Sequence, residues 1–208
     1  MKLAVLDKTG KDTGRKISLN KAIFGSEPNE HTVYLDVKQY LANQRQGTHK
    51  SKERNEIVGS TKKLKKQKGS GAARYGDVKS PIFRGGGRIF GPKPRYYGFK
   101  LNKKVKAVAK KSVLSSSIKE DKVIILEDLK FETPKTKDFV SLLKGLDLQG
   151  KRVTLVTAEN EKNLYLSSRN IQRVNVVSTS EVNTYDLINC SKLVLSESSV
   201  KEIENILS

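Results

Sequence analysis

The sequence has one cysteine, no tryptophan and no long hydrophobic run. With Cys190 alone, the 208-residue chain forms no intramolecular disulfide, which fits a reducing compartment. We expect Cys190 to be a small buried hydrophobe rather than a reactive thiol. The opening MKLAVLDKTGKD lacks the apolar stretch of a signal peptide, and no segment approaches the ~18 apolar residues of a membrane span. We therefore expect a cytoplasmic protein without a membrane partner.

Groups that support catalysis or metal binding are also scarce. The two histidines, His31 and His49, are isolated, and together with one cysteine they cannot build a zinc cluster. Neighbouring carboxylates are best interpreted as solvated ends of strands or helices: Glu127 with Asp128, and Glu159 with Glu161. No catalytic constellation and no G-x-G-x-x-G fingerprint is present. We expect neither an enzyme nor a cofactor.

One segment comes close to a phosphate-binding P-loop. Gly145–Arg152 reads GLDLQGKR, but the last position requires Ser or Thr for magnesium and has Arg152 instead. The segment also follows a predicted helix and precedes a strand, whereas a P-loop follows a strand and precedes a helix. Gly150 is therefore interpreted as a loop residue after the helix.

Negative charge is almost absent from the middle of the chain. Residues 44–111 hold 21 Lys and Arg against three acids, so they carry +18 of the total +19. The other 140 residues, with 20 basic and 19 acidic groups, are close to neutral. A neutral protein with one concentrated basic insertion is typical of a polyanion-binding device on an ordinary fold.

The same block lacks the means to fold alone. It contains 10 of the 15 glycines and three of the five prolines, with few Leu, Ile or Val. Such a composition buries too little apolar surface to offset its ordering entropy, so the block should be extended or disordered until a partner orders it. As a loop of about 55 residues it reaches at most ~90 Å, at ~3.3 Å per residue in each limb.

The remaining residues predict an α/β fold. Short strands are expected at 2–6 and 15–19, with a turn between them, and further strands at 123–126, 153–157, 174–177 and 193–195. Helices are expected at about 30–45, 102–118, 136–146, 160–168, 185–188 and from a capping box at Ser199 onward, with Pro28 opening the first and Asn102 capping the second. The lysines of the second helix should face outward. Strands alternating with helices predict a mostly parallel sheet flanked by helices.

Three residue types alternate in the block in a pattern suited to RNA. Lys and Arg neutralise phosphates, glycines allow close backbone approach, and aromatic rings stack on bases. Charge alone also fits a disordered linker, a localisation-like run at Lys62–Lys68, or duplex DNA. The sequence RGGGRIFGPKPR disfavours a mere linker, and no classical DNA-binding motif is visible. The candidate RNA-binding residues are Arg45, Gln46, His49, Lys50, Lys52, Arg54, Lys62, Lys63, Lys65, Lys66, Lys68, Arg74, Lys79, Arg84, Arg88, Lys93, Arg95, Lys100, Lys103 and Lys104.

Three stretches carry a specific resemblance: RQGTHKSKERNE (45–56), QKGSGAARYGDVKSPIFRGGG (67–87) and FGPKPRYYGFKLNKKVKAVAKKSVLSS (90–116). They closely resemble the bacterial form of the fourth large-subunit ribosomal protein family, collinearly over roughly 45–116. The resemblance implies a structural, early-assembling rRNA-binding protein whose inserted loop threads the large-subunit rRNA. It also implies that the loop tip lines the nascent-peptide exit tunnel, beside another ribosomal protein.

By the same resemblance the tip spans about Leu64–Arg74, with these residues lining the tunnel: Leu64, Lys65, Lys66, Gln67, Lys68, Gly69, Ser70 and Gly71. The sequence departs from the family here. Where a glycine-rich stretch followed by Arg-Lys-Pro-Trp-Arg is usual, it reads GSTKKLKK from Gly59. Where Gly-Arg-Ala-Arg is usual, it reads GAAR from Gly71. A Trp and an Arg are missing, which changes the shape and charge of the tip.

The organisation we expect is a globular α/β domain from 1–44 and 112–208, an extended basic rRNA-binding loop at 45–101, and a flanking basic helix at 102–118. Two other functions remain as alternatives. An RNA-modifying or nucleotide-using enzyme on a doubly wound fold would need a phosphate loop or a cofactor-binding acid at a strand end. A DNA-compacting protein would prefer duplex DNA over structured rRNA.

Overall fold

The computed structural model describes every residue from Met1 to Ser208. Its internal contacts divide the chain into two units. The first joins Met1–Leu41 to Lys100–Ser208, and the second is Ala42–Phe99. We describe each unit by itself, and call the second the basic arm.

A six-stranded sheet forms the centre of the first unit, in the order β2-β1-β3-β6-β4-β5. All neighbours pair in parallel except the β1–β2 hairpin, which is antiparallel. The mostly parallel sheet predicted from the sequence is thus confirmed. Among the strands, only β2 differs appreciably from its predicted bounds. It begins three residues earlier than predicted, so the turn between β1 and β2 is shorter. The strands are β1 (Lys2–Leu6), β2 (Asp12–Ser18), β3 (Val123–Leu126), β4 (Val153–Thr157), β5 (Val174–Ser178) and β6 (Lys192–Ser196).

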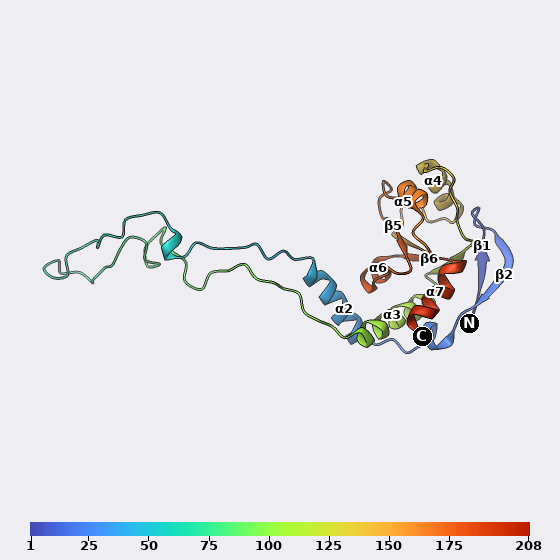
Figure 1. Ribbon diagram of the computed structural model, residues 1–208, viewed down its shortest axis with the longest axis horizontal. Helices are drawn as coiled ribbons and strands as arrows, with labels where there is room; N and C mark the ends of the chain where they lie inside the picture. The colour runs from blue at the N-terminus through green and yellow to red at the C-terminus, as the bar shows by residue number, and fades with distance from the viewer. The chain divides into compact units, whose positions relative to one another are not determined.

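Successive apolar side chains of the central strands point to opposite faces of the sheet, and both faces are buried. On β6, Leu193 and Leu195 pack on one face and Val194 packs on the other. Helices α1, α3, α6 and α7 contribute to the first core cluster, and α4 and α5 to the second. Figure 1 shows α3 and α7 on one side of the sheet and α4 and α5 on the other. The helices are α1 (Lys21–Phe24), α2 (Glu30–Asn43), α3 (Lys103–Lys119), α4 (Thr136–Gly145), α5 (Lys162–Ser168), α6 (Thr184–Asn189) and α7 (Glu197–Leu207).

The caps of three helices differ from the sequence prediction. Pro28 does not open α2, because the Asn29 side chain accepts from the Thr32 backbone N–H at 3.1 Å and caps the helix one residue later. Helix α7 begins before the expected capping box. Ser196, the last residue of β6, caps it by accepting from Ser199 N at 3.3 Å. Asn102 does precede α3, but its side chain makes no capping hydrogen bond.

The buried face of helix α3 contains serine hydroxyl groups as well as apolar side chains. Ser115 Oγ donates to the Ile23 carbonyl at 3.0 Å, and Ser112 Oγ accepts from Asn29 N at 3.1 Å. Small hydroxyls let the N-terminal segment approach the helix closely while its backbone groups stay satisfied. The prediction that the lysines of this helix face outward holds for Lys103 and Lys104, which are exposed, whereas Lys110 is half-buried. Burial lowers the pKa of its ammonium, and the nearby Asp36 carboxylate opposes that shift.

The basic arm contains almost no regular secondary structure. Its one helical turn is the 3₁₀ turn η1 (Arg54–Glu56), and it has no strand. In Figure 1 the arm is the cyan-to-green segment, two extended limbs joined at a tip. The extended conformation predicted from its composition is present. The limbs are nevertheless held together by specific contacts that composition does not reveal.

Candidate nucleic-acid interface

The predicted RNA-binding side chains are exposed, and Lys79 alone among them is half-buried. Most of them lie on the basic arm. Lys100, Lys103 and Lys104 belong to the first unit, where the latter two open α3. Ten of the exposed cations among them have no side-chain ion pair, hydrogen bond or ring contact, so their charge is available to an external anion: Lys52, Lys62, Lys66, Lys68, Arg74, Arg84, Arg88, Lys100, Lys103 and Lys104.

Two of the three acids of the arm, Asp77 and Glu53, join its two limbs, and the third, Glu56, pairs within the first limb. Arg54 pairs with Asp77 at 3.0 Å. Glu53 forms an ion pair with Lys93, and Glu56 forms one with Lys50. The backbone adds two bonds between limbs, from Ser51 N to the Pro92 carbonyl (3.1 Å) and from Arg88 N to the Lys52 carbonyl (2.9 Å). We call this region, residues 50–56 with 77–93, the arm joint.

The electrostatics of the joint follow from these pairs. The hydrogen bond from Lys50 keeps the pKa of the Glu56 carboxyl below its ordinary value. The hydrogen bond to Glu53 raises the pKa of the Lys93 ammonium. Both pairs are exposed, so they contribute little to stability. Asp77 differs because it is buried, and the arginine is its charge partner.

One aromatic ring organises the base of the arm. The guanidinium carbons of Arg45 and Arg95 lie 3.7 and 4.5 Å from the centre of the Tyr97 ring. The hydroxyl of Tyr97 also lies 2.6 Å from His49 Nε2. Cation–π contacts of this kind hold an arginine in place without consuming its N–H donors. The two arginines remain able to bind phosphate while they close the limbs.

Two glycines stand where the limbs pass closest. Gly47 has φ +67°, and a Cβ there would lie 2.0 Å from the Arg95 carbonyl oxygen. Gly87 faces η1, where a Cβ would lie 2.4 Å from Arg54 N. A larger residue at either position would separate the limbs. These glycines serve contacts within the arm in addition to any approach of RNA.

The tip is a separate closed loop. Leu64 N donates to the Gly76 carbonyl at 3.0 Å, and the Lys65 ammonium lies 5.2 Å from the centre of the Tyr75 ring. The bond encloses residues 65–75, and within it Gly69 and Gly71 have positive φ. Residues 61–74 are all exposed. The tip assigned by resemblance therefore coincides with a distinct structural element.

Several large apolar side chains on the arm have no covering. Val58, Ile82 and Phe90 are at least four-fifths exposed, and Ile89 and Tyr96 are exposed as well. Phe90 also has φ +53°, which is costly for a residue with a side chain. A backbone held in this way to present a bare aromatic ring next to arginines is typical of a surface that stacks on bases or fills a groove.

Nothing in the first unit resembles a catalytic or metal centre. No three His, Cys, Asp or Glu side chains gather where they could hold a metal ion. Cys190 is buried, as predicted, and burial raises the pKa of its thiol. None of the helices combines the length and apolar character that crossing a bilayer requires.

Sequence reasoning found the cations but missed how they are arranged. The signal for the arm joint in the sequence was the presence of three acidic residues in an otherwise basic block. Acidic side chains do not help to bind a polyanion, so their presence indicates ion pairs within the block. The sequence also did not predict that a second group of cations, in the first unit and outside the basic block, lies together in the fold. Two of its members, Lys151 and Arg152, belong to the segment that resembles a P-loop.

An α/β domain connected to a cationic and aromatic arm is typical of a nucleic-acid-binding protein. Comparison with known proteins makes this specific. Residues 17–206 match the model of the Ribosomal protein L4/L1 family, so the chain belongs to that family. It is 60% identical to the Large ribosomal subunit protein uL4 of Phocaeicola vulgatus over 208 residues, covering all of both chains.

Other relatives give the same result. The chain is 57% identical over 208 residues to the protein of the same name from Flavobacterium johnsoniae, and 56% identical over 207 residues to that from Bacteroides fragilis. In both cases the whole of each chain is covered. Membership makes this chain an rRNA-binding structural constituent of the large ribosomal subunit, as the resemblance had indicated.

Proposed function

We propose that the chain binds large-subunit rRNA early in subunit assembly, threads its basic arm through that RNA, and lines the nascent-peptide exit tunnel with the arm tip. The proposed partners are the large-subunit rRNA, neighbouring ribosomal proteins including the one that shares the tunnel constriction, and the passing nascent peptide. The observation that carries the proposal is the arm itself, which combines unpaired exposed cations with uncovered aromatic rings.

The arm joint supports the threading role. A disordered polycation pays the full entropy of ordering when it binds. Contacts between the limbs at the joint and at Tyr97 lower that cost, because the chain is already paired before it meets RNA. The ten unpaired cations then act on phosphates, and binding releases counterions.

The closed tip supports the tunnel role. Residues 65–75 form a small exposed loop rather than a continuation of the limbs, and their charged groups are lysines and one arginine. With Ala72 in place of the arginine usual in the family, we propose a tip that is slimmer but still cationic. Such a tip would meet the nascent peptide mainly through flexible ammonium groups.

The enzyme alternative finds no support in the sheet. Ligands of doubly wound folds bind beyond the carboxyl ends of the strands. Here that edge carries Asp128 and Glu159, together with Glu127 and Glu197, which both pair with Arg15. Burial raises the pKa of Glu161 nearby, Lys130 opposes that shift, and the Asp128 and Glu159 carboxylates add to it. An acidic edge repels phosphate, so we propose that the protein is not an enzyme and requires no cofactor.

The test is sedimentation of a cell lysate through a sucrose gradient in high salt, with detection of this chain. Retention in the large-subunit and intact-ribosome fractions is expected for a cytoplasmic protein integral to the subunit. Release to the top of the gradient would contradict integral binding. Tight, salt-insensitive binding of a nucleotide, or preference for duplex DNA, would favour the two alternatives.

A further inference from the structure

A second group of cations lies in the first unit, at the amino edge of the parallel sheet. The residues that precede or begin four strands are Lys122 before β3, Lys192 in β6, Arg152 before β4 and Arg173 before β5. The strand order β3-β6-β4-β5 places them in a row. At ~4.8 Å between neighbouring strands the row is about 14 Å long.

Backbone hydrogen bonds fix this row firmly. Leu193 N donates to the Lys122 carbonyl at 2.9 Å, Lys192 N to the Arg152 carbonyl at 3.2 Å, and Val153 N to the Arg173 carbonyl at 2.9 Å. The ladder therefore extends through each cationic residue. Arg173 has φ +65°, a left-handed conformation that is costly for a residue with a Cβ.

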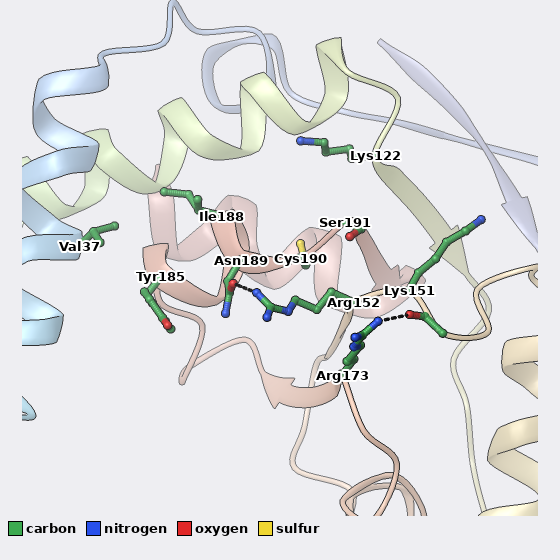
Figure 2. A pocket seen from close by; sticks show the side chains of 11 residues that line it. Val37, Lys122, Lys151, Arg152, Arg173, Tyr185, Ile188, Asn189, Cys190 and Ser191 are labelled. Atoms are coloured by element: carbon green, nitrogen blue, oxygen red, sulfur yellow. Dashed lines mark hydrogen bonds between the residues drawn. The ribbon is translucent and has the colours of Figure 1, made fainter.

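These residues border a hollow of about 870 Å³. Its lining includes Lys122, Lys151, Arg152 and Arg173 and contains no acidic residue. Figure 2 shows Arg152 bonded to the Asn189 side chain and Arg173 reaching the Gly150 carbonyl, the latter at 3.2 Å. Both acceptors are neutral, and neither guanidinium has a carboxylate within ion-pair distance.

The two lysines are less available than the arginines. Lys122 pairs with Glu120, and Lys151 lies 3.8 Å from the exposed Asp147 carboxylate. Asp186 lines an adjoining smaller hollow together with both arginines. Burial raises the pKa of that carboxyl, and Asn183 hydrogen-bonds it. The positive charge of the edge that no carboxylate pairs is therefore that of Arg152 and Arg173, which line the hollow, and of Lys192, whose ammonium donates to the Asp121 carbonyl at 2.6 Å.

The rest of the lining suits a nucleotide strand. Tyr185 and the exposed Ile188 form an apolar wall beside the arginines, and Tyr185 already stacks on Tyr40 at 4.9 Å between ring centres. A guanidinium with most of its N–H donors free matches phosphate oxygens in bidentate geometry, and an aromatic wall accepts an unstacked base. The row, about 14 Å long, is also long enough to contact more than one phosphate of a strand.

We propose that this amino-edge hollow is a second RNA-backbone site, in which Arg152 and Arg173 bind phosphates of the large-subunit rRNA independently of the basic arm. The inference rests on the proposed function, because the arm would hold the domain on rRNA and give the hollow a high effective concentration of phosphate. The proposal also assigns a role to the near-P-loop segment, in which Gly150, Lys151 and Arg152 would bind an anion. A true P-loop binds its anion at the carboxyl edge of a sheet, whereas this segment lies at the amino edge.

The test compares full-length variants on deproteinised large-subunit rRNA, with affinity measured from 50 to 300 mM KCl. Arg152→Gln with Arg173→Gln should make the slope of log affinity against log salt shallower by about 1.4–1.8, which is a 25- to 60-fold loss at 0.1 M. The matched control, Lys137→Gln with Lys144→Gln, removes the same charge from exposed positions of α4 and should leave the slope unchanged. Lysine at 152 and 173 should retain most of the slope.

Three outcomes separate the hypotheses. A slope in the arginine variant equal to that of the control would overturn the amino-edge site. Wild-type RNA binding together with loss of the variant from large subunits would also overturn it, since the hollow would then hold a protein. If arm variants also keep the wild-type slope and the chain does not prefer rRNA, the proposed function itself fails. The thermal midpoint of the variant, measured alongside, should stay within about 1–2 °C of wild type, because both arginines are exposed.

Discussion

Replacing Arg74, Arg84 and Arg88 together with glutamine isolates the counterion-release contribution of the basic arm. All three side chains are exposed, and none has an ion pair, hydrogen bond or ring contact within the chain. Glutamine keeps much of the length and polarity of the side chain and removes only its charge. The substitution therefore leaves the arm joint and Tyr97 intact.

The magnitude follows from the salt dependence of phosphate binding. Each neutralised phosphate contributes about 0.7–0.9 to the slope of log affinity against log salt, and an arm with ~10 contacts has a slope of about −7 to −9. Losing three contacts should make the slope shallower by about 2.1–2.7. At 0.1 M salt that corresponds to a loss in affinity of about 100- to 500-fold.

The assay is a binding titration of the full chain against large-subunit rRNA at several salt concentrations, together with thermal unfolding. The control replaces Lys137, Lys144 and Lys201, which are exposed on α4 and α7, with glutamine. The arm variant should keep the wild-type thermal midpoint. An unchanged slope would show that these arginines do not meet phosphate, and a large fall in thermal midpoint would show that the arm is not an exposed element.

Three further perturbations address the core, the limbs and the acidic edge. Leu195→Ala removes a fully buried side chain and should cost about 2–5 kcal/mol, seen as a thermal midpoint about 5–15 °C lower with the rRNA salt slope unchanged. Gly47→Ala places a Cβ 2.0 Å from the Arg95 carbonyl and should weaken rRNA binding, whereas Gly85→Ala, at φ +80° with open space, should weaken it far less. Glu161→Gln should raise the midpoint slightly, by about 1–2 °C at pH 7. Burial and neighbouring carboxylates raise the pKa of Glu161, so its ionised form opposes folding, and the advantage should vanish as pH falls through that raised value. An advantage that persists at low pH would contradict this cause.

The elements of the α/β domain were predictable because each depends on a local pattern. Continuous apolar runs such as Val123–Leu126 indicated strands buried on both faces, and these strands are present. Helix starts were less predictable, because residues suited to a helix start lie close together in the sequence. Asn29 caps α2 directly after Pro28, and Ser196 caps α7 three residues before Ser199. The choice depends on which backbone N–H groups the fold leaves unsatisfied, and that is a tertiary property.

The candidate site was predictable in composition and not in arrangement. Net charge identified the basic arm, but contacts such as Arg54–Asp77 join residues 23 positions apart without any periodicity to announce them. The partial burial of Lys110 was equally hidden, because nothing in the sequence separates it from the other lysines of the same helix. Charge counts average over such partners, and only three-dimensional packing separates paired cations from free ones.

The sheet itself explains why the function of this domain departs from that of most doubly wound folds. Its carboxyl edge, the usual ligand site, is acidic, and the Ser196 cap of α7 lies there as well. Its amino edge instead carries the four-cation row from Lys122 to Arg173. If the amino edge binds RNA as proposed, this difference in charge between the two edges would help to orient the domain on RNA. On this reasoning, reversing the sign at the amino edge with Arg152→Glu and Arg173→Glu should weaken rRNA binding more than the glutamine pair does. Equal effects of the two pairs would show that the row makes hydrogen bonds to RNA without acting through its field.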